Sequence, residues 1–216
     1  MPSVVGVGET VTMNVVVIGA GSLFFGRQAI WQMVFSPHLQ RGTLALVDTD
    51  PKNLKRMTTL ARKVAAHARV PLAIESSRRA AEVLKGADFV VLSFADRSAV
   101  FRDIDCRVSE KYGIRMCSGD TIGPGGIFRV LREFPRIVAY CRQIEKLCPD
   151  AWVINYINPT AANGLGLRIF APKLNSFALC DGLHMPHVKK RYAERAGIIP
   201  SVKDWTAQER QALRDD

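Results

Sequence analysis

Short apolar runs rich in Val and Ile alternate along the chain with longer segments in which apolar residues recur at the helical period. The runs predict buried strands at residues 14–20, 43–50, 71–76, 87–95, 151–159 and 175–180. The periodic segments predict helices at residues 22–34, 51–69, 78–85, 126–148, 160–170 and 187–196, with a loop following residue 95. Pro135 is expected to kink or break the fourth of these helices. Strands that alternate with helices predict an α/β fold, a doubly wound parallel sheet with right-handed crossovers.

The first predicted strand runs directly into the sequence GAGSLFFG at residues 19–26. Gly19 would permit a tight turn, Gly21 would let a pyrophosphate approach the backbone, and a helix opening at Ser22 would offer free N–H groups. The next strand ends at Asp48, whose carboxylate suits two ribose hydroxyls and repels a 2′-phosphate. These four residues predict a Rossmann-like site for NAD, and the alternative is a glycine turn beside an aspartate of no special role.

Composition narrows the class of protein. Of the residues, 48% are hydrophobic and 23% charged, as expected for a folded globular chain. The formal charge of +10 is dispersed, without the aromatic interleaving or finger spacing of nucleic-acid binders, so no nucleic-acid partner is predicted. No apolar run has the length of a membrane span, and the five scattered cysteines favour a reducing cytoplasm.

Five blocks of sequence, taken in order, resemble one family. They are VVVIGAGS, RDIDCRVSEKYGI, GDTIGPGGIFRVLREFP, INYINPT and LCDG. The set resembles the NAD-dependent glycoside hydrolases of family 4, which include α-glucosidases, α-galactosidases and 6-phospho-glucosidases. The resemblance implies a fold related to lactate and malate dehydrogenases, and a reaction that oxidises C3 of the sugar, eliminates the aglycone, adds water and re-reduces C3. It also implies NAD and a divalent metal, Mn²⁺ in most members, as cofactors.

The same resemblance implies roles for individual residues. Cys180 would ligate the metal, although a lone cysteine at a strand end is more often a buried apolar residue. Asp181 would protonate the departing oxygen, or it is only a turn residue before Gly182. Asn158 would contact the substrate, a small-molecule glycoside, with a plain Asn-Pro turn as the alternative. Arg102 would bind the sugar, or it forms a structural ion pair with Asp105.

The family's members are longer than this chain, and this shapes the predicted organisation. Residues 1–12 are predicted to be a leader, 13–197 the NAD-binding domain, and 198–216 the start of a C-terminal catalytic region. A homo-oligomer is expected. Two other functions stay open: an NAD-dependent dehydrogenase of 2-hydroxyacids on the same fold, and an NAD-binding fragment without activity.

Overall fold

The computed structural model describes residues 12–95, 97–116, 121–180, 193–195 and 197. The chain divides into two units, residues 1–178 and 179–216, and nearly all of the described residues belong to the first. The predicted leader, the predicted helix at 187–196 and the predicted C-terminal region lie largely outside the described residues. The domain boundaries drawn from the sequence therefore stay predictions.

The described residues form one six-stranded sheet in the order β3-β2-β1-β4-β5-β6, and every neighbouring pair of strands is parallel. The strands are β1 Met13–Ile18, β2 Gly42–Val47, β3 Leu72–Ser77, β4 Phe89–Leu92, β5 Trp152–Asn155 and β6 Asn175–Ala178. In the register of the sheet, Ile18 lies between Val47 and Leu92. This order and direction confirm the predicted doubly wound parallel sheet.

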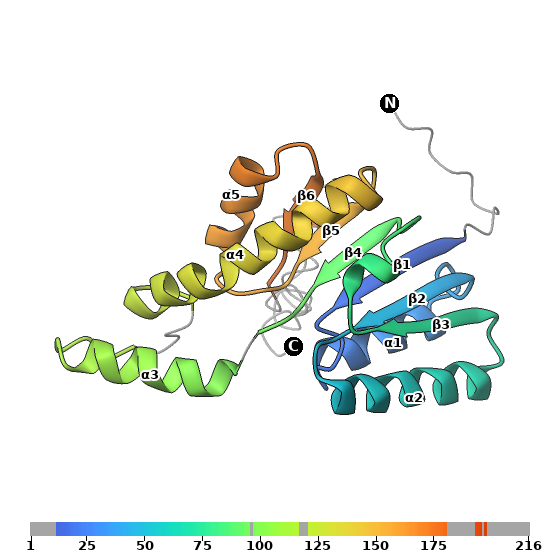
Figure 1. The fold of residues 1–216 in the computed structure, drawn as a ribbon, viewed down its shortest axis with the longest axis horizontal. Coiled ribbons are helices and arrows are strands. Elements are labelled where there is room, and N and C mark those ends of the chain that lie inside the picture. The colour runs from blue at the N-terminus through green and yellow to red at the C-terminus, as the bar shows by residue number, and fades with distance from the viewer. Residues whose placement is uncertain (1–11, 96, 117–120, 181–192, 196, 198–216) are drawn as a thin grey trace, which may run out of the picture. The chain divides into compact units, whose positions relative to one another are not determined.

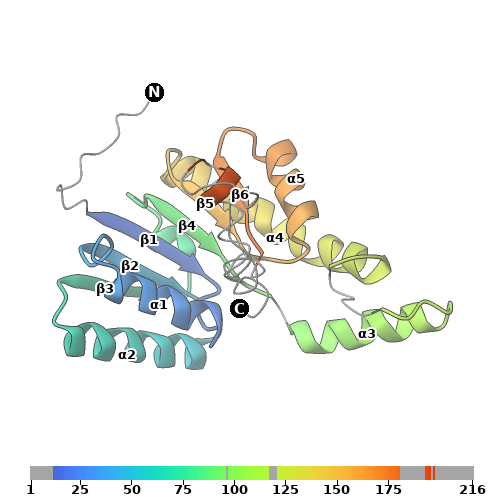
Figure 2. The same ribbon diagram turned by 180° about the vertical axis from the view of Figure 1, so that it is seen from behind.

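Helices cover both faces of this sheet (Figures 1 and 2). They are α1 Phe25–Phe35, α2 Pro51–Ala68, α3 Ser98–Glu110, α4 Pro124–Leu147 and α5 Thr160–Phe170, with a short 3₁₀ helix, η1, at Ala80–Glu82. Helices α1 and α2 lie along one face, and α4 and α5 lie along the other. Among the described residues, every helix falls short of the length and apolar character that a bilayer crossing needs.

Both faces of the central strand are buried, which explains its unbroken run of apolar residues. Val17 packs into a core with Ile30 of α1 and Met57 of α2. Its neighbour Ile18 faces the opposite core, where Ile144 of α4 is fully buried. Because successive side chains of a strand point to opposite faces, a strand covered on both sides must be apolar at every position.

Three helix predictions differ from the structure. The segment 78–85 contains only the turn η1, because Ser77 and Arg79 both bind the carboxylate of Glu82 and hold a tight turn. Helix α4 runs through Pro135 without a break, and Pro135 lies on its exposed side, where water can satisfy the carbonyl that loses its bond. The loop expected after residue 95 contains helix α3 instead.

Candidate functional site

The strand order places a topological switch point at the carboxyl ends of the central strands. Strands β1 and β4 are neighbours at the centre, and the chain leaves them toward opposite sides of the sheet. In folds of this kind, ligands bind outside the carboxyl ends of the strands at this switch point. Gly19 follows β1, Asp48 follows β2 and Asn158 follows β5, so the predicted cofactor residues and Asn158 lie at this carboxyl edge of the sheet, whereas Arg102 lies in α3.

Gly19 lies where the chain turns out of β1 against the end of β4. Its φ of +94° belongs to a region that favours glycine, and a Cβ there would lie 2.5 Å from the backbone nitrogen of Phe94. Its own N–H donates to the carbonyl of Val47, 2.8 Å away. Gly19 therefore closes the turn against both neighbouring strands, in agreement with the tight turn predicted there.

Gly21 and Asp48 are in direct contact. The N–H of Gly21 donates to Oδ2 of Asp48 at 2.8 Å, and a Cβ on Gly21 would lie 2.6 Å from the same oxygen. The other oxygen, Oδ1, accepts the N–H of Asp50 at 2.9 Å. Each carboxylate oxygen keeps a second lone pair, so Asp48 is held in place and still has acceptor capacity for a ligand. The absence of a side chain at Gly21 is what lets the carboxylate approach.

The helix after this turn begins at Phe25, three residues later than predicted. The cause is Ser22, whose Oγ accepts the N–H groups of Phe24 and Phe25, each at 3.2 Å. Those two donors are therefore occupied within the turn. Gly26, which the sequence pattern left without a role, packs α1 against the strand: a Cβ there would lie 2.0 Å from the carbonyl oxygen of Ala20.

The charge of Asp48 affects the pKa of Tyr140, a residue of α4. Its ring packs on Phe94, with the two centroids 5.3 Å apart. Burial raises the pKa of its phenol, the positive charge of Arg136 lowers it, and the negative charge of Asp48 raises it. The net effect is a raised pKa for the Tyr140 phenol, with burial as its largest cause.

The loop after β5 holds Asn158 through hydrogen bonds to its neighbours. Oδ1 of Asn158 accepts the hydroxyl of Thr160 at 3.0 Å. The preceding carbonyl, that of Ile157, accepts the side-chain amides of Asn155 at 2.9 Å and Asn163 at 2.8 Å. The peptide bond between Asn158 and Pro159 is cis. Sequence reasoning singled out Asn158 and missed Thr160 and Asn163, which the Asn-Pro-Thr order and an asparagine inside a helix could have indicated.

Two contacts bring other predicted blocks to this loop. The ring of Phe25, at the start of α1, lies 5.4 Å from the ring of Tyr156, centroid to centroid. A Cβ on Gly126, in the first turn of α4, would lie 3.7 Å from the ring of Pro159 and 3.0 Å from the carbonyl of Thr121. The glycine turn, the start of α4 and the Asn158 loop are therefore neighbours, although they lie far apart in the sequence.

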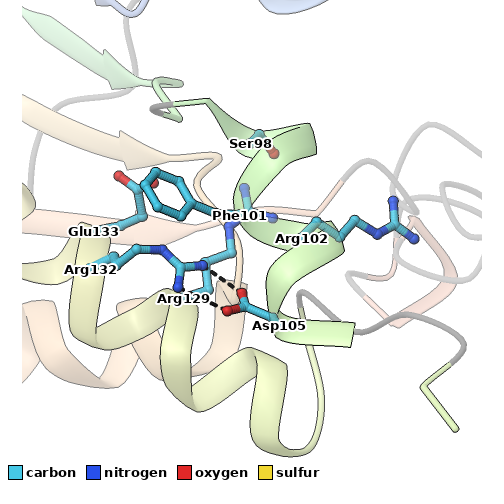
Figure 3. Close-up of a pocket in the computed structure, with 7 residues that line it drawn as sticks. All are labelled: Ser98, Phe101, Arg102, Asp105, Arg129, Arg132 and Glu133. Carbon is cyan, nitrogen blue, oxygen red and sulfur yellow. Dashed lines mark hydrogen bonds and ion pairs between the residues drawn. The ribbon is translucent and has the colours of Figure 1, made fainter. Parts of the chain in front are cut away.

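A pocket between α3 and α4 contains the predicted residue Arg102 (Figure 3). Asp105 is buried there and forms a bidentate ion pair with Arg132, with Oδ1–Nη1 at 3.0 Å and Oδ2–Nη2 at 2.6 Å. The guanidinium of Arg132 also lies 4.7 Å from the centre of the Phe101 ring. The pocket is lined by Ser98, Phe101, Arg102, Asp105, Arg129, Arg132 and Glu133.

The ion pair expected as an alternative for Arg102 does not form. Asp105 pairs with Arg132 instead, and Arg102 is exposed, with no hydrogen bond or ion pair to the described part of the chain. Figure 3 shows its side chain pointing away from the pair. The structural explanation of Arg102 is therefore wrong, and its role in binding a sugar stays a prediction.

The four cysteines among the described residues differ in exposure, and Cys106 is only partly buried. Cys141 and Cys148 are buried in α4 and at its end, and burial raises the pKa of their thiols to about 12 and about 11. Cys180 is exposed. Among the described residues, no group of three or more His, Cys, Asp or Glu side chains could hold a metal ion. Asp181, the predicted acid, lies outside the described residues.

Comparison with known proteins supports the resemblance seen in the sequence. A model described as "Family 4 glycosyl hydrolase" matches residues 14–202. The chain is 34% identical over 197 residues to an alpha-galacturonidase of Thermoanaerobacter italicus and 32% identical over 169 residues to an alpha-glucosidase of Erwinia rhapontici. The aligned residues make up 89% and 77% of this chain, but only 42% and 37% of the two relatives. The chain therefore spans about two fifths of the relatives' length.

Solved structures give the same answer for the fold. The Bacillus subtilis protein lplD is similar over 91% of this chain and 45% of its own, with a TM-score of 0.74 and 26% identity. A 6-phospho-beta glucosidase of Thermotoga maritima, solved with manganese, NAD⁺ and glucose-6-phosphate, has a TM-score of 0.72 at 20% identity over 86% of this chain and 44% of its own. A lactate dehydrogenase of Cryptosporidium parvum, 12% identical over 88% of this chain and 50% of its own, shares the fold alone at a TM-score of 0.55. With the family match over residues 14–202 and the shared fold, the chain belongs to family 4 of the glycosyl hydrolases.

Proposed function

We propose that the chain is an NAD- and divalent-metal-dependent glycosidase that acts by oxidation at C3, elimination of the aglycone, addition of water and re-reduction. The observation that carries the proposal is the contact between Gly21 and Asp48 at the carboxyl ends of β1 and β2. It presents an anchored carboxylate beside a backbone that has no side chain in the way. This arrangement fits the ribose and pyrophosphate of NAD.

Within this proposal, the chain's own residues bind and orient the NAD and the glycoside. Asp48 would accept the two ribose hydroxyls, and Gly19, Gly21 and Ser22 would bring backbone close to the pyrophosphate. Asn158 and Arg102 would hold the glycoside, and Asp181 would protonate the departing oxygen. Bound NAD⁺ would supply a reversible hydride acceptor, so NADH would not accumulate over a turnover.

The metal is the second part of the proposal. A thiolate is the ligating form of cysteine, and Cys180 is exposed and therefore accessible to a cation. It would be one ligand, and the described residues provide no complete set around it. The Thermotoga maritima relative, solved with manganese and NAD⁺, supports the pairing of these two cofactors. The homo-oligomeric state and the cytoplasmic location predicted from the sequence stay predictions.

Two measurements test the cofactor part. Calorimetry of the purified chain should show that NAD⁺ binds more tightly than NADP⁺, because Asp48 repels the 2′-phosphate. In Asp48→Ser, the preference for NAD⁺ over NADP⁺, expressed as the ratio of their dissociation constants, should fall about tenfold. A change of this size is expected when one charge–charge repulsion is lost. Asp103→Ser, on the exposed side of α3, is the matched control and should leave the ratio unchanged.

Activity is tested with nitrophenyl glycosides in the presence of NAD⁺, Mn²⁺ and a reductant. Release of nitrophenol without net NADH supports the glycosidase. NADH that accumulates with a 2-hydroxyacid would identify a dehydrogenase instead. NAD⁺ binding with neither product would leave an NAD-binding fragment as the function of this chain.

A further inference from the structure

Two fully buried asparagines hold the chain immediately before Asn158. Asn155 ends β5 and Asn163 lies in α5, and both side chains are 0% exposed. Their amide Nδ2 atoms donate to one acceptor, the carbonyl oxygen of Ile157, at 2.9 Å and 2.8 Å. A carbonyl oxygen has two lone pairs, so both are used. The peptide that leads into Asn158 is thereby fixed in direction from two different elements of the fold.

A third residue fixes the side chain of Asn158 itself. The hydroxyl of Thr160 donates to Oδ1 of Asn158 at 3.0 Å. That contact assigns the oxygen of the amide to Thr160 and turns the Nδ2 group the other way. Within the described part of the chain, Nδ2 of Asn158 has no hydrogen-bond partner, and the side chain is partly exposed. Asn158 therefore presents N–H donors at the carboxyl edge of the sheet.

This arrangement costs the fold some stability. Oδ1 of Asn155 and Oδ1 of Asn163 are buried and have no hydrogen-bond partner among the described residues. Buried polar atoms without a partner are unfavourable, and an apolar side chain of the same size would avoid that cost. Leucine could fill both positions but could not donate a hydrogen bond to the Ile157 carbonyl. The two asparagines therefore indicate that this hydrogen bond is the reason for a polar residue at each position.

We propose that Asn155, Thr160 and Asn163 are positioning residues that make Asn158 a hydrogen-bond donor to an oxygen of the nicotinamide half of NAD. The proposal rests on the proposed function, because it needs NAD at the carboxyl ends of the strands. Strands β4 to β6 form the half of the sheet that would hold the nicotinamide nucleotide, and Asn158 follows β5. ADP-ribose lacks the nicotinamide, so its affinity should depend less on Asn158 than the affinity of NAD⁺ does.

The experiment compares NAD⁺ and ADP-ribose binding to the purified chain and its variants by calorimetry. Thr160→Val removes the hydroxyl with little change in shape, and it should weaken NAD⁺ about fivefold, as expected for one neutral hydrogen bond, while ADP-ribose binding stays within twofold. Thr160→Ser keeps the hydroxyl and should restore the wild-type ratio. Asn163→Leu should behave like Thr160→Val. Thr59→Val is the matched control. It removes a hydroxyl that bonds to the Lys55 carbonyl on the exposed side of α2, and it should change the affinity for neither ligand.

A ligand-free measurement keeps the inference separate from the proposed function. In ¹⁵N-labelled protein, the side-chain amide signals of Asn158, identified by their loss in Asn158→Asp, should shift and broaden in Thr160→Val and Asn163→Leu. Unchanged signals, or equal losses of NAD⁺ and ADP-ribose affinity that follow a lower melting temperature, would overturn the positioning role. A wild-type chain that binds neither ligand but shows the expected signal changes would instead defeat the NAD proposal and leave the positioning of Asn158 standing.

Discussion

The two halves of the sheet treat their polar groups differently. In the first half, β1 to β3 with α1 and α2, the polar groups of the site bond to one another: Gly21 to Asp48, Asp48 to Asp50, and Ser22 to Phe24 and Phe25. In the second half, β4 to β6 with α3 to α5, buried Oδ1 atoms of Asn155 and Asn163 lack partners among the described residues. Exposed Arg102 lacks one as well.

The two halves therefore differ in how many polar groups near the site are already bonded within the fold. In the first half, Gly21, Ser22 and Asp48 are bonded within the fold before any ligand arrives, so the fold sets their positions, although the Asp48 oxygens keep lone pairs. In the second half, Asn158 and Arg102 keep donors without a partner among the described residues, and both side chains are at least partly exposed to a ligand. The Oδ1 atoms of Asn155 and Asn163 are buried and out of a ligand's reach. Every cysteine of the sequence also lies after the first half, at positions 106, 117, 141, 148 and 180. The predictions below test the contrast, starting with the largest effect.

The second half should depend most on the ion pair between Asp105 and Arg132. Asp105→Ala leaves a partly buried guanidinium without its carboxylate, and we expect the free energy of unfolding to fall by about 3 kcal/mol. Urea unfolding measures the loss. Asp103→Ala removes an exposed pair with Arg107 on the same helix and should cost only about 0.5 kcal/mol. Equal losses of unfolding free energy in the two variants would show that the buried pair stabilises the fold no more than the exposed pair.

Two helical glycines, one in each half, should respond differently to alanine. A Cβ on Gly26 would lie 2.0 Å from the carbonyl oxygen of Ala20, so Gly26→Ala should destabilise the chain by about 2 kcal/mol. In α5, a Cβ on Gly164 would meet only the Cβ of Ala178, at 3.0 Å. There the better helix propensity of alanine, about 1 kcal/mol, should offset the contact. Thermal melting of both variants measures the two effects. A loss at Gly164 as large as that at Gly26 would show that the distance to the nearest atom does not set the cost of the added Cβ.

Alkaline pH should destabilise the second half through Cys141. Burial raises the pKa of this thiol to about 12, so the folded state keeps the proton while the unfolded chain releases it near the ordinary value of 9.0. The stabilisation is complete below pH 9 and is lost as pH rises toward 12, by about 2 kcal/mol at pH 10.5. Urea unfolding at pH 8 and pH 10.5 should show this loss in the wild type and a smaller one in Cys141→Val. The same slope in both proteins would rule out Cys141 as its source.

The smallest effect is expected at Ser22. Its hydroxyl accepts the first N–H groups of α1, so Ser22→Ala should lower the free energy of unfolding by about 1 kcal/mol. Ser22→Thr keeps the acceptor and should recover most of this. If Ser22→Ala were neutral to stability yet weakened NAD⁺ binding, the hydroxyl would serve the ligand and not the helix.

Sequence patterns predicted the sheet better than the helices. All six strands fall within the predicted runs, to within one residue at an end. The signal is clearest for central β1, which is covered on both faces and apolar at nearly every position, and weaker for β3 and β6 at the two ends of the sheet, which carry polar and exposed residues. Helix α3 was missed although Phe101, Ile104 and Val108 recur at helical spacing, because its polar face is large and most of it is exposed. Pro135 does not break α4, since a proline on the solvent side of a helix loses a bond that water replaces.

The sequence by itself determined the strand and helix alternation, the glycine turn, Asp48 and the family blocks, because these depend on local periodicity and on residue types at short spacing. Only the tertiary structure decided that Asp105 pairs with Arg132, that Gly26 packs on Ala20, and that Asn163 holds the carbonyl before Asn158. Partners at these distances along the chain are chosen by how helices pack on the sheet. Hydrogen bonds and ion pairs depend on that packing to within fractions of an ångström, and no local pattern encodes it.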